Sequence, residues 1–193
     1  GGIRSVDDAQ RLISSGADKI AINSEIVRRP SLITEIANHL GSQCVVCSIQ
    51  ARRQSNYSWQ VMIESGRECI DLDVLSWAQK VENLGAGEIL LTSVDQDGTE
   101  KGPDKELIKQ VSNLVDIPVI ACGGFANDEQ VLSTIKDTTI TGLAIASALH
   151  YQNIDVIKLK RRMKLESIDV RLTNSKCNHL FLNNIRTSSF KNL

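Results

Sequence analysis

One structural unit occurs twice in this chain, and the repetition constrains the fold more than any other feature. An apolar run at 117–121 stops at Cys122-Gly123-Gly124, and after a helical pattern a second apolar run ends at Ala146-Ser147. The earlier copy has the same order, from Gly1-Gly2 to Asn23-Ser24. Its double glycine lies 122 positions before the later one (124 − 2). Matched order at matched spacing predicts an internal repeat of a strand–helix–strand unit.

Each copy places very small residues where its strands end. Gly124 follows the first strand of the later unit, and Gly2 holds the matching position in the earlier unit; Ser24 and Ser147 follow the second strand of each. Small residues leave backbone N–H groups exposed at the carboxyl edge of a sheet, and such groups bind anions. We therefore expect two phosphate-binding cups, one in each copy.

Apolar runs and amphipathic helical patterns alternate throughout the chain before its tail. Helices are expected at 6–13, 32–40, 73–84, 105–115 and 127–135, and strands at 17–22, 43–49, 88–94, 117–121 and 141–145. Trp59–Ile63 is expected to form half of a short hairpin, followed by a turn at Gly66–Glu68. This order predicts a parallel sheet covered by helices, with six strand ends if Gly1-Gly2 marks one.

Two folds have this order, an open doubly wound sheet and a closed (β/α)8 TIM barrel. The twofold repeat with small residues at strand ends favours the barrel, whose phosphate sites follow its late strands. A complete barrel needs about 250 residues, so we expect an incomplete one here, with about strands 3–8 present in residues 1–172. The absence of an initiator methionine and of a strand before Gly1-Gly2 favours the same interpretation.

Composition excludes several classes of function. A net charge of −1 and a pI near 6.4 do not favour nucleic-acid binding, and no run approaches the roughly 18 apolar residues of a membrane span. Five scattered cysteines suit a reducing cytoplasm. Cys44 and Cys47 lie in an expected strand, where residues three apart face opposite sides, so we expect no metal site. Residues 173–193 are rich in Asn and Ser and are expected to form a disordered tail.

Several blocks of sequence resemble one enzyme family. They are Gly2 to Ser24, Leu-Gly-Ser-Gln at 40–43, Gly-Ala-Gly-Glu-Ile-Leu-Leu-Thr-Ser at 85–93, and Asp97-Gly98-Thr99. The chain resembles the cyclase subunit of imidazole glycerol phosphate synthase, the HisF family of histidine biosynthesis. The likeness covers about residues 1–172, implies a (β/α)8 barrel, and places Gly1 at the end of the third barrel strand.

The resemblance implies a cyclase and lyase that uses ammonia from a glutaminase partner and needs no cofactor or metal. Its substrate would be an aminoimidazole carboxamide ribonucleotide with a phosphate at each end, split into imidazole glycerol phosphate and an aminoimidazole nucleotide. The residues that match substrate and phosphate positions of the family are Gly2, Asn23, Ser24, Thr92, Asp97, Gly98, Cys122, Gly124, Ala146 and Ser147. Cys122 stands where the family commonly has serine, and a thiol is the weaker hydrogen-bond donor.

The resemblance also implies two catalytic aspartates, at the ends of the first and fifth barrel strands. The first would precede Gly1, and the second corresponds to Gln50. Alternation along the strand places Gln50 at its carboxyl end, on the face shared by Val46 and Ser48. An amide can position a substrate but cannot accept a proton near neutral pH, and loss of a general acid or base typically costs about 10²–10⁴-fold in rate. Asp95, Asp97 and Asp104 are nearby carboxylates, for which loop and helix-cap roles are expected.

Lys19 and Glu88 are charged residues at the opposite end of their strands. Lys19 shares the face of Asn23, and Glu88 shares the face of Thr92, so both should point inward about 13 Å below the active edge. The resemblance implies that they line an ammonia passage facing the glutaminase. An ion pair that only closes the end of the barrel is the structural alternative.

Two other functions stay open from the sequence. One is a paralogue of the family in which a glutaminase-coupled barrel amidates a surface sugar, favoured by Gln50 and by Ala121–Gly124. The other is a catalytically inactive barrel fragment that binds phosphate or a partner. The two intact cups and Asp97-Gly98-Thr99 favour the cyclase.

Overall fold

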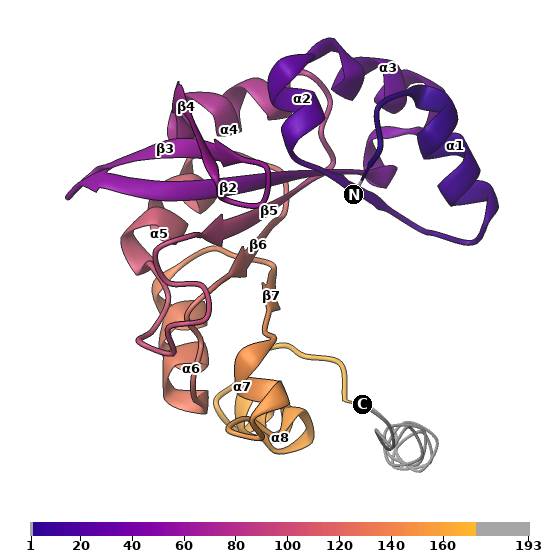
Figure 1. Cartoon of the computed structure of the whole chain (residues 1–193). Coiled ribbons are helices and arrows are strands. Elements are labelled where there is room, and N and C mark those ends of the chain that lie inside the picture. Colours follow the sequence, from indigo (N-terminus) through magenta and orange to yellow (C-terminus); the bar gives the residue numbers. More distant parts are fainter. Residues whose placement is uncertain (1, 173–193) are drawn as a thin grey trace, which may run out of the picture.

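The computed structural model describes residues 2–172 of the chain. Helices and strands alternate along much of this part, as the sequence predicts, with an insertion of consecutive strands after the strand that ends at Ser55 (Figure 1). In chain order the elements are α1 (Val6–Ser14), β1 (Ile20–Ile22), α2 (Ser24–Arg28), α3 (Ser31–Leu40), η1 (Ser42–Cys44), β2 (Val45–Ser55), β3 (Ser58–Ile63), β4 (Glu68–Asp73), α4 (Val74–Asn83), β5 (Glu88–Ser93), α5 (Lys105–Leu114), β6 (Val119–Cys122), α6 (Asp128–Asp137), β7 (Gly142–Ala144), α7 (Ser147–His150) and α8 (Val156–Leu165). The tail expected at 173–193 lies outside the described residues.

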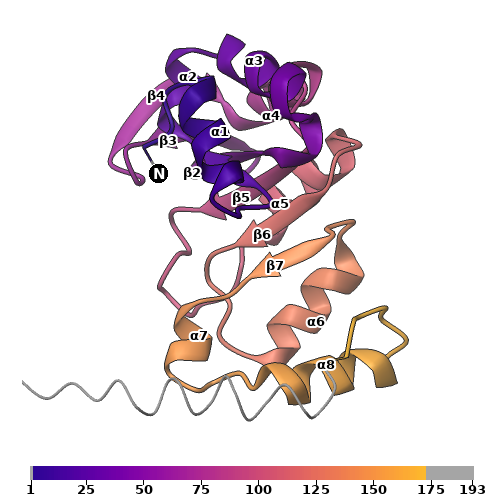
Figure 2. The ribbon, with the colours of Figure 1, turned by 90° about the vertical axis from the view of Figure 1, so that its right-hand side faces the viewer.

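Five strands of the described residues form a parallel array in the order β1, β2, β5, β6 and β7. Figures 1 and 2 show these strands as one curved sheet, with β7 at its far end and α4, α5 and α6 along one side. This is part of a (β/α)8 barrel, and it confirms the predicted fold. The expected strand end at the double glycine is not matched by a strand, because residues 2–4 enter α1 without pairing.

A three-stranded antiparallel meander extends from the parallel sheet. β2 continues beyond the barrel to Ser55 and pairs with β3, which pairs in turn with β4. The hairpin predicted from Trp59–Ile63 is confirmed, but the third strand was not foreseen. The turn expected at Gly66–Glu68 lies slightly earlier, because the left-handed backbone of Glu64, Ser65 and Gly66 reverses the chain and β4 already begins at Glu68.

The start of β2 also differs from the sequence interpretation. Cys44 belongs to the one-turn helix η1, and the strand begins at Val45. The side chain of Cys44 donates to the Leu40 carbonyl, 3.4 Å away, whereas Cys47 is fully buried. The two thiols therefore lie in different surroundings and form no pair.

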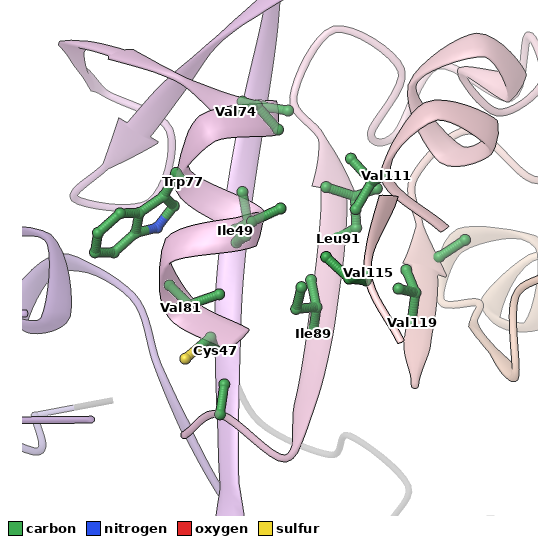
Figure 3. Packing of buried hydrophobic residues seen from close by; sticks show 14 of the residues in the cluster. Cys47, Ile49, Val74, Trp77, Val81, Ile89, Leu91, Val111, Val115 and Val119 are labelled. Atoms are coloured by element: carbon green, nitrogen blue, oxygen red, sulfur yellow. The ribbon is translucent and has the colours of Figure 1, made fainter. Parts of the chain in front are cut away.

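The hydrophobic core lies between the sheet and the helices. Figure 3 shows Cys47 and Ile49 of β2 and Ile89 and Leu91 of β5 packed beside Val74, Trp77 and Val81 of α4 and Val111 of α5. These side chains are at most 1% exposed. Apolar residues three and four apart on α4 form the stripe that covers the strands.

The other face of the sheet is much less covered. It carries Val46, Ser48 and Gln50 of β2 and the residues paired with them on β5 and β6. Apart from Val46, these side chains are only partly buried. This face corresponds to the interior of a barrel, and its polar residues gather at the carboxyl end of the strands. Within residues 2–172, no helix is both long and apolar enough to cross a membrane.

Candidate active site

The two repeat units have the same backbone geometry. Gly2 and Gly124 have φ angles of +84° and +86°. Ser5 and Asn127 then cap α1 and α6 from extended conformations, each with its side chain accepting the N–H three residues later. Asn23 (φ −118°, ψ −85°) and Ala146 (φ −121°, ψ −71°) precede the short helices α2 and α7. The internal repeat predicted from the sequence is thus present in the torsion angles.

The two units sit at opposite ends of the parallel array. β1 pairs within it only with β2, and β7 pairs only with β6, so three strands separate them. Between them, Gln50 is in register with Thr92, and Thr92 with Cys122. In-register residues of parallel strands point to the same side. One row of polar side chains therefore runs across the carboxyl edge from the first unit toward the second.

The first predicted cup lines a cavity of about 290 Å³. Gly2, Asn23, Ser24 and Gln50 all contribute to its wall, so the structure brings together residues that are up to 48 positions apart. The Asn23 amide donates to the carbonyls of Ser48 (2.9 Å) and Met62 (3.2 Å), which fastens β1 to β2 and β3. Because that side chain is already engaged, its contribution to an anion site would come through the backbone.

The second predicted cup is built around close backbone contacts. A Cβ atom on Gly124 would lie 2.2 Å from the Gly102 carbonyl oxygen, and one on Gly123 would lie 2.9 Å from the Ser93 oxygen. The Gly102 N–H donates to the Gly124 carbonyl at 2.9 Å. These glycines let the loop after β5, which carries Asp97 and Gly98, pack over the end of β6. Ala146 and Ser147 start α7 beside this edge, with Ala146 exposed.

Gln50 and Cys122 are the central polar groups of the row. The Gln50 side-chain oxygen is buried and has no hydrogen-bond partner among the described residues. An unpaired buried acceptor in a cavity wall is a position where a ligand can donate a hydrogen bond. Burial raises the pKa of the Cys122 thiol, and the Asp97 carboxylate acts in the same direction, against a hydrogen bond with Thr92. The raised pKa disfavours the thiolate form of Cys122, which is the form that acts as a nucleophile.

The carboxylates on the loop after β5 have separate roles. Asp104 is buried, caps α5 through the Leu107 N–H, and accepts from Arg53 and from the Trp59 indole. Asp95 accepts the Arg53 backbone N–H at 2.7 Å. The structural roles expected for Asp95 and Asp104 are confirmed. Asp97 is exposed, and its side chain accepts no hydrogen bond within residues 2–172.

Comparison with known proteins identifies the family. Residues 1–155 match the family model described as "Histidine biosynthesis protein". The chain belongs to this family. Its relatives include subunits HisF of imidazole glycerol phosphate synthase from Streptococcus mutans and Bacillus cereus strain G9842, each 44% identical over 171 and 172 residues respectively. Both alignments cover 89% of this chain and 68% of the relative. The Legionella pneumophila HisF subunit is 58% identical over 130 residues, or 67% of this chain and 61% of the relative.

Membership of the histidine biosynthesis family confirms the resemblance read from the sequence. At the amino end of the sheet, Lys19 and Glu88 form an ion pair with 2.9 Å between nitrogen and oxygen. The ion-pair alternative is therefore present, and the ammonia passage stays a prediction. No group of three or more His, Cys, Asp and Glu residues in the described part of this family member is arranged to hold a metal ion.

Several residues of the first predicted cup were missed by the sequence interpretation of this histidine biosynthesis protein, among them a charged pair. Arg28 and Glu64 also line the cavity and form an ion pair with each other. Arg28 lies four positions after Ser24 on α2, on the same helical face, so the spacing alone gave a signal. Glu64 reaches the site from the β3–β4 turn, and the unforeseen meander explains why it was missed.

Proposed function

We propose that this chain is the ammonia-dependent cyclase subunit of imidazole glycerol phosphate synthase. It takes a bis-phosphorylated aminoimidazole carboxamide ribonucleotide, adds ammonia, and releases imidazole glycerol phosphate and an aminoimidazole nucleotide. Family membership and relatives named as subunits of this enzyme support the assignment. They favour it over amidation of a surface sugar.

One observation supports the proposal most: the two units predicted to be anion cups have matching backbone geometry and lie at the two ends of one parallel array. Four strand spacings of about 4.8 Å separate β1 from β7, or about 19 Å along the curved sheet. A molecule with a phosphate at each end can occupy both cups only if its middle lies over the intervening row. Gly2, Asn23 and Ser24 hold one phosphate in this proposal, and Gly124, Ala146 and Ser147 hold the other.

Gln50, Thr92 and Cys122 then face the middle of the substrate. The Gln50 amide can accept at its unpaired oxygen and donate from its nitrogen, so we assign it to orienting the substrate. It cannot transfer a proton near neutral pH. Asp97 and Gly98 lie on the loop that contacts Gly123 and Gly124, and we place them against the substrate near the second phosphate.

The ammonia source in this proposal is a glutaminase subunit bound at the amino end of the strands. Lys19 and Glu88 mark that end, opposite the cups, and ammonia would pass between them toward Gln50. We place the enzyme in the cytoplasm, in keeping with four free cysteines among the described residues.

The decisive experiment supplies ammonium chloride and the bis-phosphorylated ribonucleotide to the purified chain and follows imidazole glycerol phosphate by chromatography. The native chain and a Gln50→Asp variant are compared, together with complementation of a histidine auxotroph. Product from the native chain supports the cyclase and shows that an aspartate at position 50 is dispensable. Product from neither protein, with phosphate binding retained, would favour the inactive barrel fragment.

A further inference from the structure

The first cup contains charges that cancel one another. Arg4, Arg28, Glu25 and Glu64 line the cavity, two cationic and two anionic side chains. The Arg28 guanidinium lies 2.8 Å from the Glu64 carboxylate and 3.8 Å from that of Glu68. The Arg28 guanidinium in the cavity wall is therefore a group suited to bind phosphate. In this structure it is already paired with carboxylates from the β3–β4 segment.

The β3–β4 turn brings Glu64 to this position. Its backbone N–H donates to the Ser24 hydroxyl at 3.0 Å, so the turn is fastened to the cup at two points of the same residue. Glu64 and Ser65 have φ angles of +50° and +59°, in the left-handed region. Non-glycine residues there cost on the order of 1 kcal/mol or more each and persist when surrounding contacts hold them. The contacts to Ser24 and Arg28 are such contacts.

We propose that Arg28 is a phosphate ligand of the first cup, and that Glu64 competes with the phosphate for its guanidinium. This inference rests on the proposed function, because it takes the first cup as a phosphate site. When phosphate binds, Arg28 exchanges the carboxylate for phosphate oxygens, and the carboxylate of Glu64 turns to solvent.

The exchange is physically accessible. The side chains of Arg28 and Glu64 are both 51% exposed, and pairs of this kind contribute little to stability and separate easily. A phosphate dianion offers more charge and three acceptor oxygens to the planar guanidinium, which binds phosphate through parallel hydrogen bonds. The Ser24 hydroxyl, which now accepts from Glu64 and donates to Asn23, lies one helical turn from Arg28.

Among residues 2–172, no ion pair matching Arg28–Glu64 lies at the second predicted cup. The position four residues after Ser147 is Tyr151, which is neutral. The proposed exchange of Arg28 between Glu64 and phosphate is thus confined to the first cup, although the backbone geometry of the two cups matches. The difference allows one cup to serve as a reference for the other.

The test is a titration of the ¹⁵N-labelled chain with inorganic phosphate, followed separately at the backbone amides of Ser24 and Ser147. Arg28→Gln should weaken phosphate binding at Ser24 about tenfold, as expected for loss of a charge-assisted hydrogen bond. Glu64→Gln should tighten it about threefold or more, because the competing carboxylate is gone. Neither change should alter the affinity read at Ser147, which also reports that each variant is folded.

A neighbouring ion pair supplies matched controls. Arg29 pairs with Glu35 at similar exposure but lies outside the cavity, so Arg29→Gln and Glu35→Gln should leave both affinities unchanged. Equal affinities at Ser24 in the native chain and in both cavity variants would overturn the inference while leaving the cups intact. If phosphate shifts neither the Ser24 nor the Ser147 amide signal in the native chain, the proposed function would instead be overturned.

Discussion

The ammonium group of Lys19 lies 2.9 Å from the carboxylate of Glu88, although their strands are separated by β2. Lys19 directly precedes β1, and Glu88 is paired in register with Val46. The contact therefore spans the inner face of the sheet at its amino end. Lys19 is half-exposed, whereas the Glu88 side chain is 13% exposed.

Neutralising Lys19 should reduce the turnover that depends on ammonia from the glutaminase, but not the turnover with added ammonium. In Lys19→Gln we expect turnover with glutamine and the glutaminase partner to fall severalfold, while turnover with ammonium chloride stays near native. The free energy of unfolding should fall by about 1–3 kcal/mol, because Lys19 is half-exposed but the mostly buried Glu88 carboxylate loses its partner. Lys105→Gln, which breaks a surface pair with Asp137, is the control and should affect neither turnover. Equal loss with both nitrogen sources would rule out a delivery role.

Removal of Asp104 should destabilise the fold far more than removal of another helix cap. Asp104 is buried and holds Arg53, Trp59 and the first turn of α5 together. In Asp104→Ala we expect the free energy of unfolding, measured with urea, to drop by about 3–5 kcal/mol, since a buried ionic network loses its centre. Asp155→Ala removes an exposed cap of α8 and should cost about 1 kcal/mol. Similar losses in the two variants would contradict this account.

The repeat offers a paired test of its glycines. Gly2 and Gly124 share a left-handed φ, yet a Cβ on Gly2 would meet no atom within 4 Å, whereas one on Gly124 would collide with the Gly102 carbonyl. Gly2→Ala should therefore cost only the conformational term of about 1–2 kcal/mol. Gly124→Ala should cost more and displace the loop that carries Asp97. Thermal unfolding checks the order, and an equal cost at the two positions would refute the argument from packing.

Cys47 should make the protein less stable in alkali. Burial raises its pKa from 9.0 to about 12, so between these values the unfolded chain releases a proton that the folded chain keeps. Stability is thus fully present below pH 9 and falls by about 1.4 kcal/mol per pH unit above it, as far as about pH 12. Urea titrations at pH 8 and 10 measure this loss. It should shrink in Cys47→Val but persist after Cys69→Ser, because Cys69 is exposed.

The sequence predicted the parallel strands and long central helices because their apolar residues follow clear periods. The helix α8 was not predicted, because among its residues only Leu159 is fully buried. The short helices α2 and α7 carry one buried residue each and were not predicted either. The strand β4 was not predicted, because its only partly buried apolar residues are Ile70 and Leu72 and none of its residues is fully buried.

At the site, strand alternation placed Gln50 on the inner face, and the family resemblance named Thr92 and Cys122 as site residues. The register that sets the three side by side in one row comes from the structure. The Arg28–Glu64 pair could not be predicted, because it depends on a turn in which two residues other than glycine, Glu64 and Ser65, have left-handed backbone conformations. The contacts of Asp104 with Arg53 and Trp59 join segments 45 to 51 positions apart, a separation beyond any local pattern.

The near-identity of the torsion angles at Asn23 and Ala146 has a consequence for the direction of binding. If both predicted cups hold phosphate, as proposed above, their shared backbone shape cannot by itself distinguish the head of a bis-phosphorylated molecule from its tail. A reversed substrate would satisfy the same backbone N–H groups. Which end lies where must then be decided by what breaks the symmetry: the charged pair beside α2 and the glycine-packed loop beside α7. In the proposed site, the orientation of the substrate is therefore set by side chains and not by the backbone.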